Sequence, residues 1–297
     1  MSNALCWPFV SAMSQPKSAS APVSPLEVGP VESVVLGLLA IGLCLLIAWI
    51  VRRILRPGKL SLSNSPGRPN LLNPGHIVGV LLLMWGAAAL AEVTLGPLMG
   101  EDSPQYEILR SLSVQVVWLA AALVMGAIAF VHGLRRGMGL TARRWILDSL
   151  RGGWAFLAVL PVCLGLMLAS KSVLEHYGIQ SIEHESLELA WQVSTPWLVL
   201  LGLSVVVLAP LTEEIFFRGL VQSMLRRYLH RPWVAVVLTA VFFAALHEPY
   251  WYSMPPLLAL GLAIGYNYER TGRLWAPILI HALFNALNLG LKIAEQP

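Results

Sequence analysis

The polar residues best suited to chemistry lie in the last third of the chain, inside runs of apolar sequence. One run is interrupted by charged residues, the next ends in a histidine, and the final run holds a histidine and an asparagine: Glu213, Glu214, Arg218, His247, His281 and Asn285. An ionisable group within a membrane segment costs at least ~2.5–3.5 kcal/mol on insertion scales, so such groups mark functional sites by default. These six residues form the candidate site.

Their side chains suit the attack of an activated water on a carbonyl group. A glutamate removed from water is a stronger base, because burial disfavours its charged form. Such a carboxylate can take a proton from water while a neighbouring histidine shares that proton and orients the water. A second histidine and an asparagine amide can donate hydrogen bonds to the oxyanion of a tetrahedral intermediate.

Helical spacing assigns some of these side chains to shared faces. Glu214 and Arg218 are four residues apart and can pair on one face. Because a buried, unpaired arginine is prohibitive, Glu214 is predicted to be its counter-ion, which is structural support and not catalysis. Glu213 points about a quarter-turn away and stays free. His281 and Asn285 also share a face, although Asn285 can equally serve as an interhelical hydrogen bond.

Metal chemistry stays open as an alternative. Glu213, His247 and His281 are three potential zinc ligands that would leave a fourth position open. An asparagine suits hydrogen bonding better than zinc ligation, so water activation without a metal or other cofactor is favoured. The only aspartates, Asp102 and Asp148, are expected in loops, which argues against an aspartyl protease pair, and no HExxH motif occurs.

The elements that carry these residues are predicted to be membrane helices. The chain is 57% hydrophobic and 12% charged, whereas soluble domains carry about 25% charged residues. Eight apolar runs indicate an all-α integral membrane protein of about eight transmembrane helices. The runs are Ser33–Val51, Ile77–Leu98, Leu112–Val131, Gly153–Ser170, Trp197–Leu225, Trp233–Leu246, Leu257–Tyr268 and Leu274–Leu291. The sixth and seventh are short, and form either two spans or a re-entrant hairpin.

Three of these helices are predicted to place their polar groups at overlapping depths. At ~1.5 Å per residue, Glu213 and His247 lie ~20 and ~24 Å from the nearest basic residue at the cytoplasmic end of each helix. The corresponding distances for His281 and Asn285 are ~12 and ~18 Å. All four are near the middle of a ~30 Å hydrocarbon layer, as one shared site requires.

The basic residues orient the helices. Fifteen of the twenty lysines and arginines follow the first, third or fifth run or precede the last, and such loops are cytoplasmic by the positive-inside rule. Both termini are then extracytoplasmic, in the inner or cytoplasmic membrane. This placement explains the net charge of +4 without a nucleic-acid partner.

The chain is expected to divide into four parts. Residues 1–32 are rich in Ser, Pro and Ala and are predicted to be a disordered extracytoplasmic tail. Residues 33–196 form N-terminal membrane helices, 197–291 the catalytic helices, and 292–297 a C-terminal tail.

Three short motifs in this order resemble those of the CPBP intramembrane proteases, the group of CAAX prenyl endopeptidases and bacteriocin-immunity proteins. Glu213 to Arg218 resembles the EExxxR motif, Phe243 to His247 the FxxxH motif, and His281 to Asn285 the HxxxN motif. The resemblance covers about residues 197–291.

The resemblance implies an eight-helix membrane core with Glu213 and His247 as the water-activating pair. It also implies that His281 and Asn285 stabilise the oxyanion. The predicted function is therefore an intramembrane endopeptidase that cuts a protein or peptide substrate at the lipid bilayer, CAAX-type processing included. Two alternatives are a proton-coupled transporter, whose expected inverted repeats are not seen, and a non-catalytic scaffold or immunity protein.

Overall fold

The computed structural model of the chain describes residues 29–56, 58, 61–62, 65–178, 185–247 and 251–294. Within these ranges the secondary structure is helical, apart from one isolated bridge between Asn70 and Phe130. The prediction of an all-α membrane protein is confirmed. The predicted disordered tail lies outside the described residues as far as residue 28.

All eight predicted runs are helical. In the part of the chain that the structure describes, six helices are long and apolar enough to cross a membrane: α1 (Pro30–Leu55), α2 (Pro74–Met99), α3 (Pro104–Ala129), α4 (Trp145–His176), the continuous helix Thr195–Leu229, and α11 (Trp275–Ala294). The predicted short pair corresponds to α9 (Pro232–Ala245) and α10 (Met254–Thr271), so eight full spans remain a prediction. A further short helix, α5 (Glu185–Gln192), precedes Thr195.

Two helix starts differ from the prediction for local reasons. Helix α1 begins at Pro30 because proline suits the first helical position and the Glu32 carboxylate accepts a hydrogen bond of 2.8 Å from the Gly29 N–H. Helix α4 begins at Trp145, two turns before the predicted apolar run. Asp148, expected in a loop, therefore lies in the first turn of α4 and is fully buried.

The burial of Asp148 is explained by its partner before α11. Arg273 donates two hydrogen bonds of 2.6 Å to the two carboxylate oxygens of Asp148. This contact raises the pKa of the Arg273 guanidinium above its ordinary value and keeps it charged. The pair fastens the start of α4 to the start of α11.

The helix Thr195–Leu229 contains two π-helical stretches. It runs through α6 (Thr195–Leu203), η4 (Ser204–Leu208), α7 (Ala209–Glu214), η5 (Ile215–Gln222) and α8 (Ser223–Leu229). In η4 the Ala209 N–H bonds the Ser204 carbonyl, five residues earlier. Pro210 follows, so the helix passes the proline through a π turn and stays continuous.

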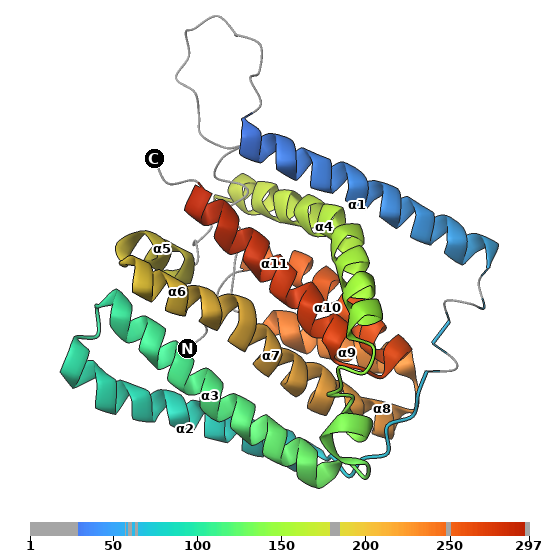
Figure 1. The fold of residues 1–297 in the computed structure, drawn as a ribbon, viewed down its shortest axis with the longest axis horizontal. Helices are drawn as coiled ribbons and strands as arrows, with labels where there is room; N and C mark the ends of the chain where they lie inside the picture. The colour runs from blue at the N-terminus through green and yellow to red at the C-terminus, as the bar shows by residue number, and fades with distance from the viewer. Residues whose placement is uncertain are drawn as a thin grey trace, which may run out of the picture.

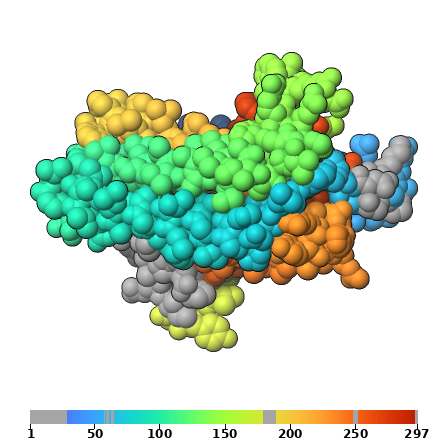
Figure 2. All heavy atoms as spheres, turned by 90° about the horizontal axis from the view of Figure 1, so that it is seen from below, coloured from blue at the N-terminus to red at the C-terminus, as the bar shows by residue number. Residues whose placement is uncertain are grey.

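The helices lie side by side with this helix near the centre of the molecule (Figure 1). Helices α2 and α3 pack together, and α3 also contacts α7 and η5. Helix α11 packs against α4, α7 and η4, while α10 packs against α9, α4 and α11. Helix α1 lies on the outer side of α4. Seen from below, α2 and α3 cover much of the molecule (Figure 2).

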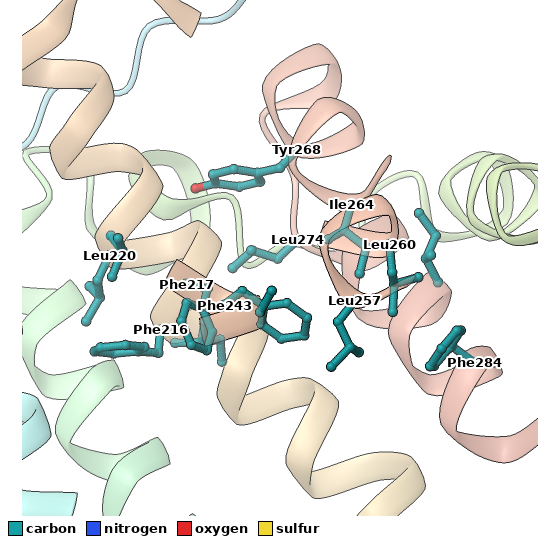
Figure 3. Close-up of a cluster of buried hydrophobic side chains, with 14 of the residues drawn as sticks. Phe216, Phe217, Leu220, Phe243, Leu257, Leu260, Ile264, Tyr268, Leu274 and Phe284 are labelled. Atoms are coloured by element: carbon teal, nitrogen blue, oxygen red, sulfur yellow. The ribbon is translucent and has the colours of Figure 1, made fainter. Parts of the chain in front are cut away.

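Apolar side chains face both outward and inward. Exposed fractions of 74% at Leu55, 80% at Leu98 and 70% at Ile128 fit a surface in contact with lipid. The core contains an aromatic group of Phe216, Phe217 and Phe243 (Figure 3). The Phe217 ring contacts the other two edge to face, with centroids 5.1 and 5.2 Å apart. This group contacts the candidate site, because the Phe243 ring lies against Arg218, His247 and His281.

A second set of buried charged groups lies nearer the basic ends of the helices. This Glu269 cluster comprises the buried Arg68, Gln222, Tyr268 and Glu269 and the partly exposed Arg226. The Glu269 carboxylate accepts hydrogen bonds from Arg68 and from the Gln222 amide, and lies 3.7 Å from the Arg226 Nε. Arg68 stacks over the Tyr268 ring at 4.0 Å, and the Tyr268 hydroxyl donates to the Met138 carbonyl. The cluster thus joins two basic segments, the one after α1 through Arg68 and the one after α3 through Met138, to η5, α8 and α10.

Candidate active site

Glu213, Glu214 and Arg218 lie where α7 passes into the π-helical η5. Their exposed fractions are 5%, 0% and 0%, so all three are removed from the surface. Arg218 donates a 3.0 Å hydrogen bond to Glu214 Oε1 and a 3.2 Å bond to the Gly261 carbonyl. The guanidinium also stacks over the Phe243 ring at 4.9 Å. Glu214 and Arg218 therefore form a buried ion pair at the four-residue spacing.

His281 lies between the two glutamates. Its Nδ1 is 2.8 Å from Glu214 Oε1, and its Nε2 is 3.9 Å from Glu213 Oε2. Because Glu214 Oε1 already accepts from Arg218, it is the acceptor for His281 as well, so Nδ1 carries the hydrogen. His281 Nε2 is thereby directed at Glu213.

His247 follows α9, immediately beyond its last turn. Its Nδ1 is 2.7 Å from the Phe243 carbonyl, and since a carbonyl can only accept, Nδ1 is the protonated nitrogen. The Phe243 ring lies against both histidines, with centroids 4.7 Å from His247 and 5.6 Å from His281. His247 therefore borders the same site, with Nε2 left as an acceptor.

Asn285 completes a backbone hydrogen bond that Pro210 cannot make. The π register set by Ala209 and Ser204 would next join residue 210 to the Val205 carbonyl, but proline has no N–H. Asn285 Nδ2 donates to that carbonyl instead, at 2.8 Å. One amide hydrogen thus links α11 to η4, and the second remains for another acceptor.

Several polar atoms of the site are buried without a hydrogen bond among the described residues: Glu213 Oε2, Glu214 Oε2, His247 Nε2, Asn285 Oδ1 and both side-chain polar atoms of Asn288. Buried polar atoms are normally satisfied, by the protein or by ordered water. A site with so many open donors and acceptors is suited to bind water or a polar group such as a substrate carbonyl.

The zinc alternative can be compared with this geometry. Within the described residues no three His, Cys, Asp or Glu side chains are grouped closely enough to hold a metal ion. Glu213 and His281 approach each other, with 3.9 Å between Oε2 and Nε2.

Sequence reasoning missed part of the support of this site. Gly261 allows α10 to approach: a Cβ there would lie 3.1 Å from the Ala240 Cβ and 3.5 Å from the Arg218 Nη2. Gly265, four residues later, would place a Cβ 2.9 Å from the Gln222 side chain. This GxxxG spacing in an apolar helix is a signal for close helix packing and was available in the sequence. Glu269 continues the same face of α10.

The fold and site together define a multi-pass membrane protein with a buried Glu/His cluster on three packed helices. Residues 195–287 match the family described as type II CAAX prenyl endopeptidase Rce1-like, close to the predicted catalytic part. An uncharacterized 24.3 kDa protein of Escherichia coli is 30% identical over 163 residues, which cover 51% of this chain and 72% of the relative. No solved structure matches.

The chain therefore belongs to the CPBP family of intramembrane proteases, through its Rce1-like domain. The predictions of a multi-pass membrane protein and of a protease family are confirmed at that level.

Proposed function

We propose that this protein is an endopeptidase that cleaves a protein or peptide substrate within the membrane through a water activated by Glu213. The observation that carries the proposal is the arrangement of His281 Nε2, 3.9 Å from Glu213 Oε2, with His247 Nε2 and Asn285 as further open polar groups. The family match supports the reaction class.

Charge balance favours distinct protonation states for the two histidines. Two buried carboxylates require two positive charges, because an unbalanced buried ion is strongly disfavoured. Arg218 supplies one, and His281, in contact with Glu214 and near Glu213, supplies the other when both its nitrogens are protonated. His247, held by a carbonyl and facing no carboxylate in the described contacts, stays neutral.

In the proposed reaction Glu213 takes a proton from water as its oxygen attacks the scissile carbonyl carbon. His247 Nε2 accepts a hydrogen bond from the remaining O–H of the water, which stays on the attacking oxygen, and so orients the nucleophile. The oxyanion receives hydrogen bonds from His281 Nε2–H and from the second amide hydrogen of Asn285. When the tetrahedral intermediate collapses, the C–N bond breaks and Glu213 delivers its proton to the leaving amine.

The proposed substrate is a membrane-associated protein cut near its C terminus or beside its membrane segment, with CAAX-type processing as the specific case. Its support is the description of the matching family. The proposed orientation places the basic loops in the cytoplasm, following the lysine and arginine distribution.

The decisive experiment combines substrate discovery with matched variants. Membrane proteomes of cells that carry the wild type or Glu213→Gln are compared for accumulated uncleaved precursors, and one precursor is then cleaved by purified protein. Glu213→Gln and His247→Ala are expected to lower kcat by about 10²–10⁴-fold. Glu92→Gln, which removes an exposed carboxylate on α2, is the control and is expected to retain activity.

Undiminished cleavage by both folded site variants would refute the proposed roles. If the Glu213→Gln variant restores the wild-type phenotype to a deletion strain, the scaffold function would be favoured instead. Proton-coupled uptake into vesicles, abolished by the same substitution, would favour the transporter.

The reaction is also proposed to need no metal. Cleavage by purified protein is expected to stay within about twofold after dialysis against a zinc chelator, since the proposed base and oxyanion donors are protein side chains. Loss of activity that added zinc restores would contradict this part of the proposal and leave the protease class intact.

A further inference from the structure

A pocket of about 810 Å³ lies apart from the candidate site, between α1, α4, α9 and α10. These four helices can be followed in Figure 1. Its volume is within the ~300–1,000 Å³ range of ligand-binding pockets. None of the six candidate site residues lines it.

Helix α10 separates the pocket from the candidate site. Its Gly261 side faces Ala240 and Arg218, and its Gly265 side faces Gln222. Leu262, Ala263 and Tyr266, which alternate with those glycines, line the pocket instead. A ligand in this pocket therefore contacts a face of α10 that the proposed reaction does not use.

The pocket is basic at one end and apolar at the other. Its lining includes five arginines and no acidic residue: Arg52, Arg144, Arg151, Arg270 and Arg273. All five lie at or near the basic ends of α1, α4, α10 and α11. The deeper lining is apolar, for example Leu46 on α1, Val162 on α4 and Leu262 on α10. At ~1.5 Å per residue, Val162 lies ~16 Å farther along α4 than Arg151.

The arginines are not all neutralised within the protein. Asp148, behind the lining, pairs with Arg151 and Arg273. Arg52 and Arg144 are exposed and form no ion pair within the part of the chain that the structure describes. This end of the pocket therefore carries an excess of positive charge, with two guanidiniums available to an anion.

Aromatic side chains mark the level between the two ends. The Trp233 and Tyr266 rings stack with centroids 5.6 Å apart, and the Trp49 ring meets Tyr266 edge to face at 6.2 Å. Trp and Tyr favour the headgroup level of a bilayer. The sequence of arginines, aromatic rings and apolar residues along the pocket matches the sequence of phosphate, glycerol backbone and acyl chain in a phospholipid.

We infer that this pocket binds one anionic phospholipid, with its phosphate at Arg52 and Arg144 and an acyl chain between α1, α4 and α10. Basic pockets between helices on the cytoplasmic side are a recurring kind of site for anionic headgroups. An occupied pocket would strengthen the contact between α1 and α10, which Trp49 and Tyr266 already make.

The test measures lipid binding directly and is independent of proteolysis. The full chain in detergent is titrated with phosphatidylglycerol or phosphatidylcholine, and bound lipid is counted by native mass spectrometry. One phosphatidylglycerol is expected to bind more tightly than phosphatidylcholine, and more weakly at high salt. Arg52→Gln with Arg144→Gln is expected to weaken phosphatidylglycerol binding by about 30-fold, which is about fivefold for each arginine.

The matched control is Arg135→Gln with Arg136→Gln. These two exposed arginines lie in η3 (Gly133–Met138) and do not line the pocket. Their substitution removes the same charge as the pocket pair. Their loss is expected to change phosphatidylglycerol binding by less than about twofold. A second variant, Val162→Trp, fills the apolar end and is expected to lower affinity for both lipids, with an unchanged Tm in phosphatidylcholine as the check on folding.

Three results would overturn the inference. Equal affinity for the two lipids would remove the headgroup preference. An equal loss in the control pair would reduce the effect to the general basic surface. Unchanged phosphatidylglycerol binding by the pocket variants, together with a raised KM only for lipid-modified substrates, would show that the pocket holds a substrate tail instead.

Discussion

Two groups of buried charged side chains occupy the same helices and behave differently. The candidate site and the Glu269 cluster both combine η5 with α10, and both hold an arginine–glutamate ion pair with no exposed glutamate. In the Glu269 cluster one carboxylate faces two arginines and an amide. In the site two carboxylates face one arginine and one histidine.

The difference lies in how the charges are balanced. Glu269 is surrounded by fixed donors, so its charge is permanently compensated and it joins loops to helices. Among the ion pairs of the described residues, Glu213 faces His281 alone, at 3.9 Å, and that partner can gain or lose a proton. A buried carboxylate held by fixed charges is structural, whereas one facing a titratable partner and an open acceptor is suited to proton transfer.

The sharpest test of this difference is a pair of isosteric substitutions. Glu269→Gln leaves Arg68 buried without its counter-ion, so the free energy of unfolding is expected to fall by about 3–5 kcal/mol. Glu213→Gln removes only the longer 3.9 Å pairing with His281, a partner that can release its proton, and is expected to lower stability by less than half as much. Unfolding in mixed detergent micelles measures both, and cleavage is normalised to the folded fraction.

The order of the two variants is expected to reverse when cleavage activity is measured instead of stability. Folded Glu269→Gln is expected to cleave at close to the wild-type rate, while Glu213→Gln is expected to lose cleavage. If both variants lose the same stability and the same activity per folded molecule, the two clusters have no separate roles.

A smaller effect is expected at Asn285, which has both a structural role, in its bond to the Val205 carbonyl, and a proposed role in catalysis. Asn285→Ala removes a proposed oxyanion donor, so kcat is expected to fall by about 10²–10³-fold while KM changes little. Asn267→Ala on α10 makes the same chemical change outside the site and is the control, because its amide donates to the Ala263 carbonyl one turn earlier in the same helix, at 2.9 Å. Equal losses in the two variants would reduce Asn285 to helix packing.

The sequence predicted the helices and the composition of the site because both follow local rules. Apolar runs of membrane length became helices, and residues four apart, such as Glu214 and Arg218, met on one face. The contacts from α10 were not predictable in this way. Helical spacing gives Arg68 and Glu269 no partner, since residues 201 positions apart are joined only by tertiary packing.

The role of Asn285 in backbone bonding depended on a register that spacing alone does not reveal. An α-helical reading of 197–225 places Val205 in an ordinary hydrogen bond with Ala209. The π stretch moves that partner to position 210, where proline has no N–H. The HxxxN motif identified the asparagine, but only the π register explains why one of its hydrogens points to η4.

The finest test of this arrangement is a double-mutant cycle between Pro210 and Asn285. In Pro210→Ala, the new N–H at position 210 can bond the Val205 carbonyl by itself. Asn285→Ala should then destabilise the wild-type protein by about 1 kcal/mol and the Pro210→Ala protein by much less, which gives a coupling energy of about 0.5–1.5 kcal/mol. Unfolding in mixed micelles of the four proteins measures it. Additive losses would mean that the two residues do not share one carbonyl, which would refute the structural role of Asn285. Its proposed contact with the oxyanion would then be tested by kcat alone.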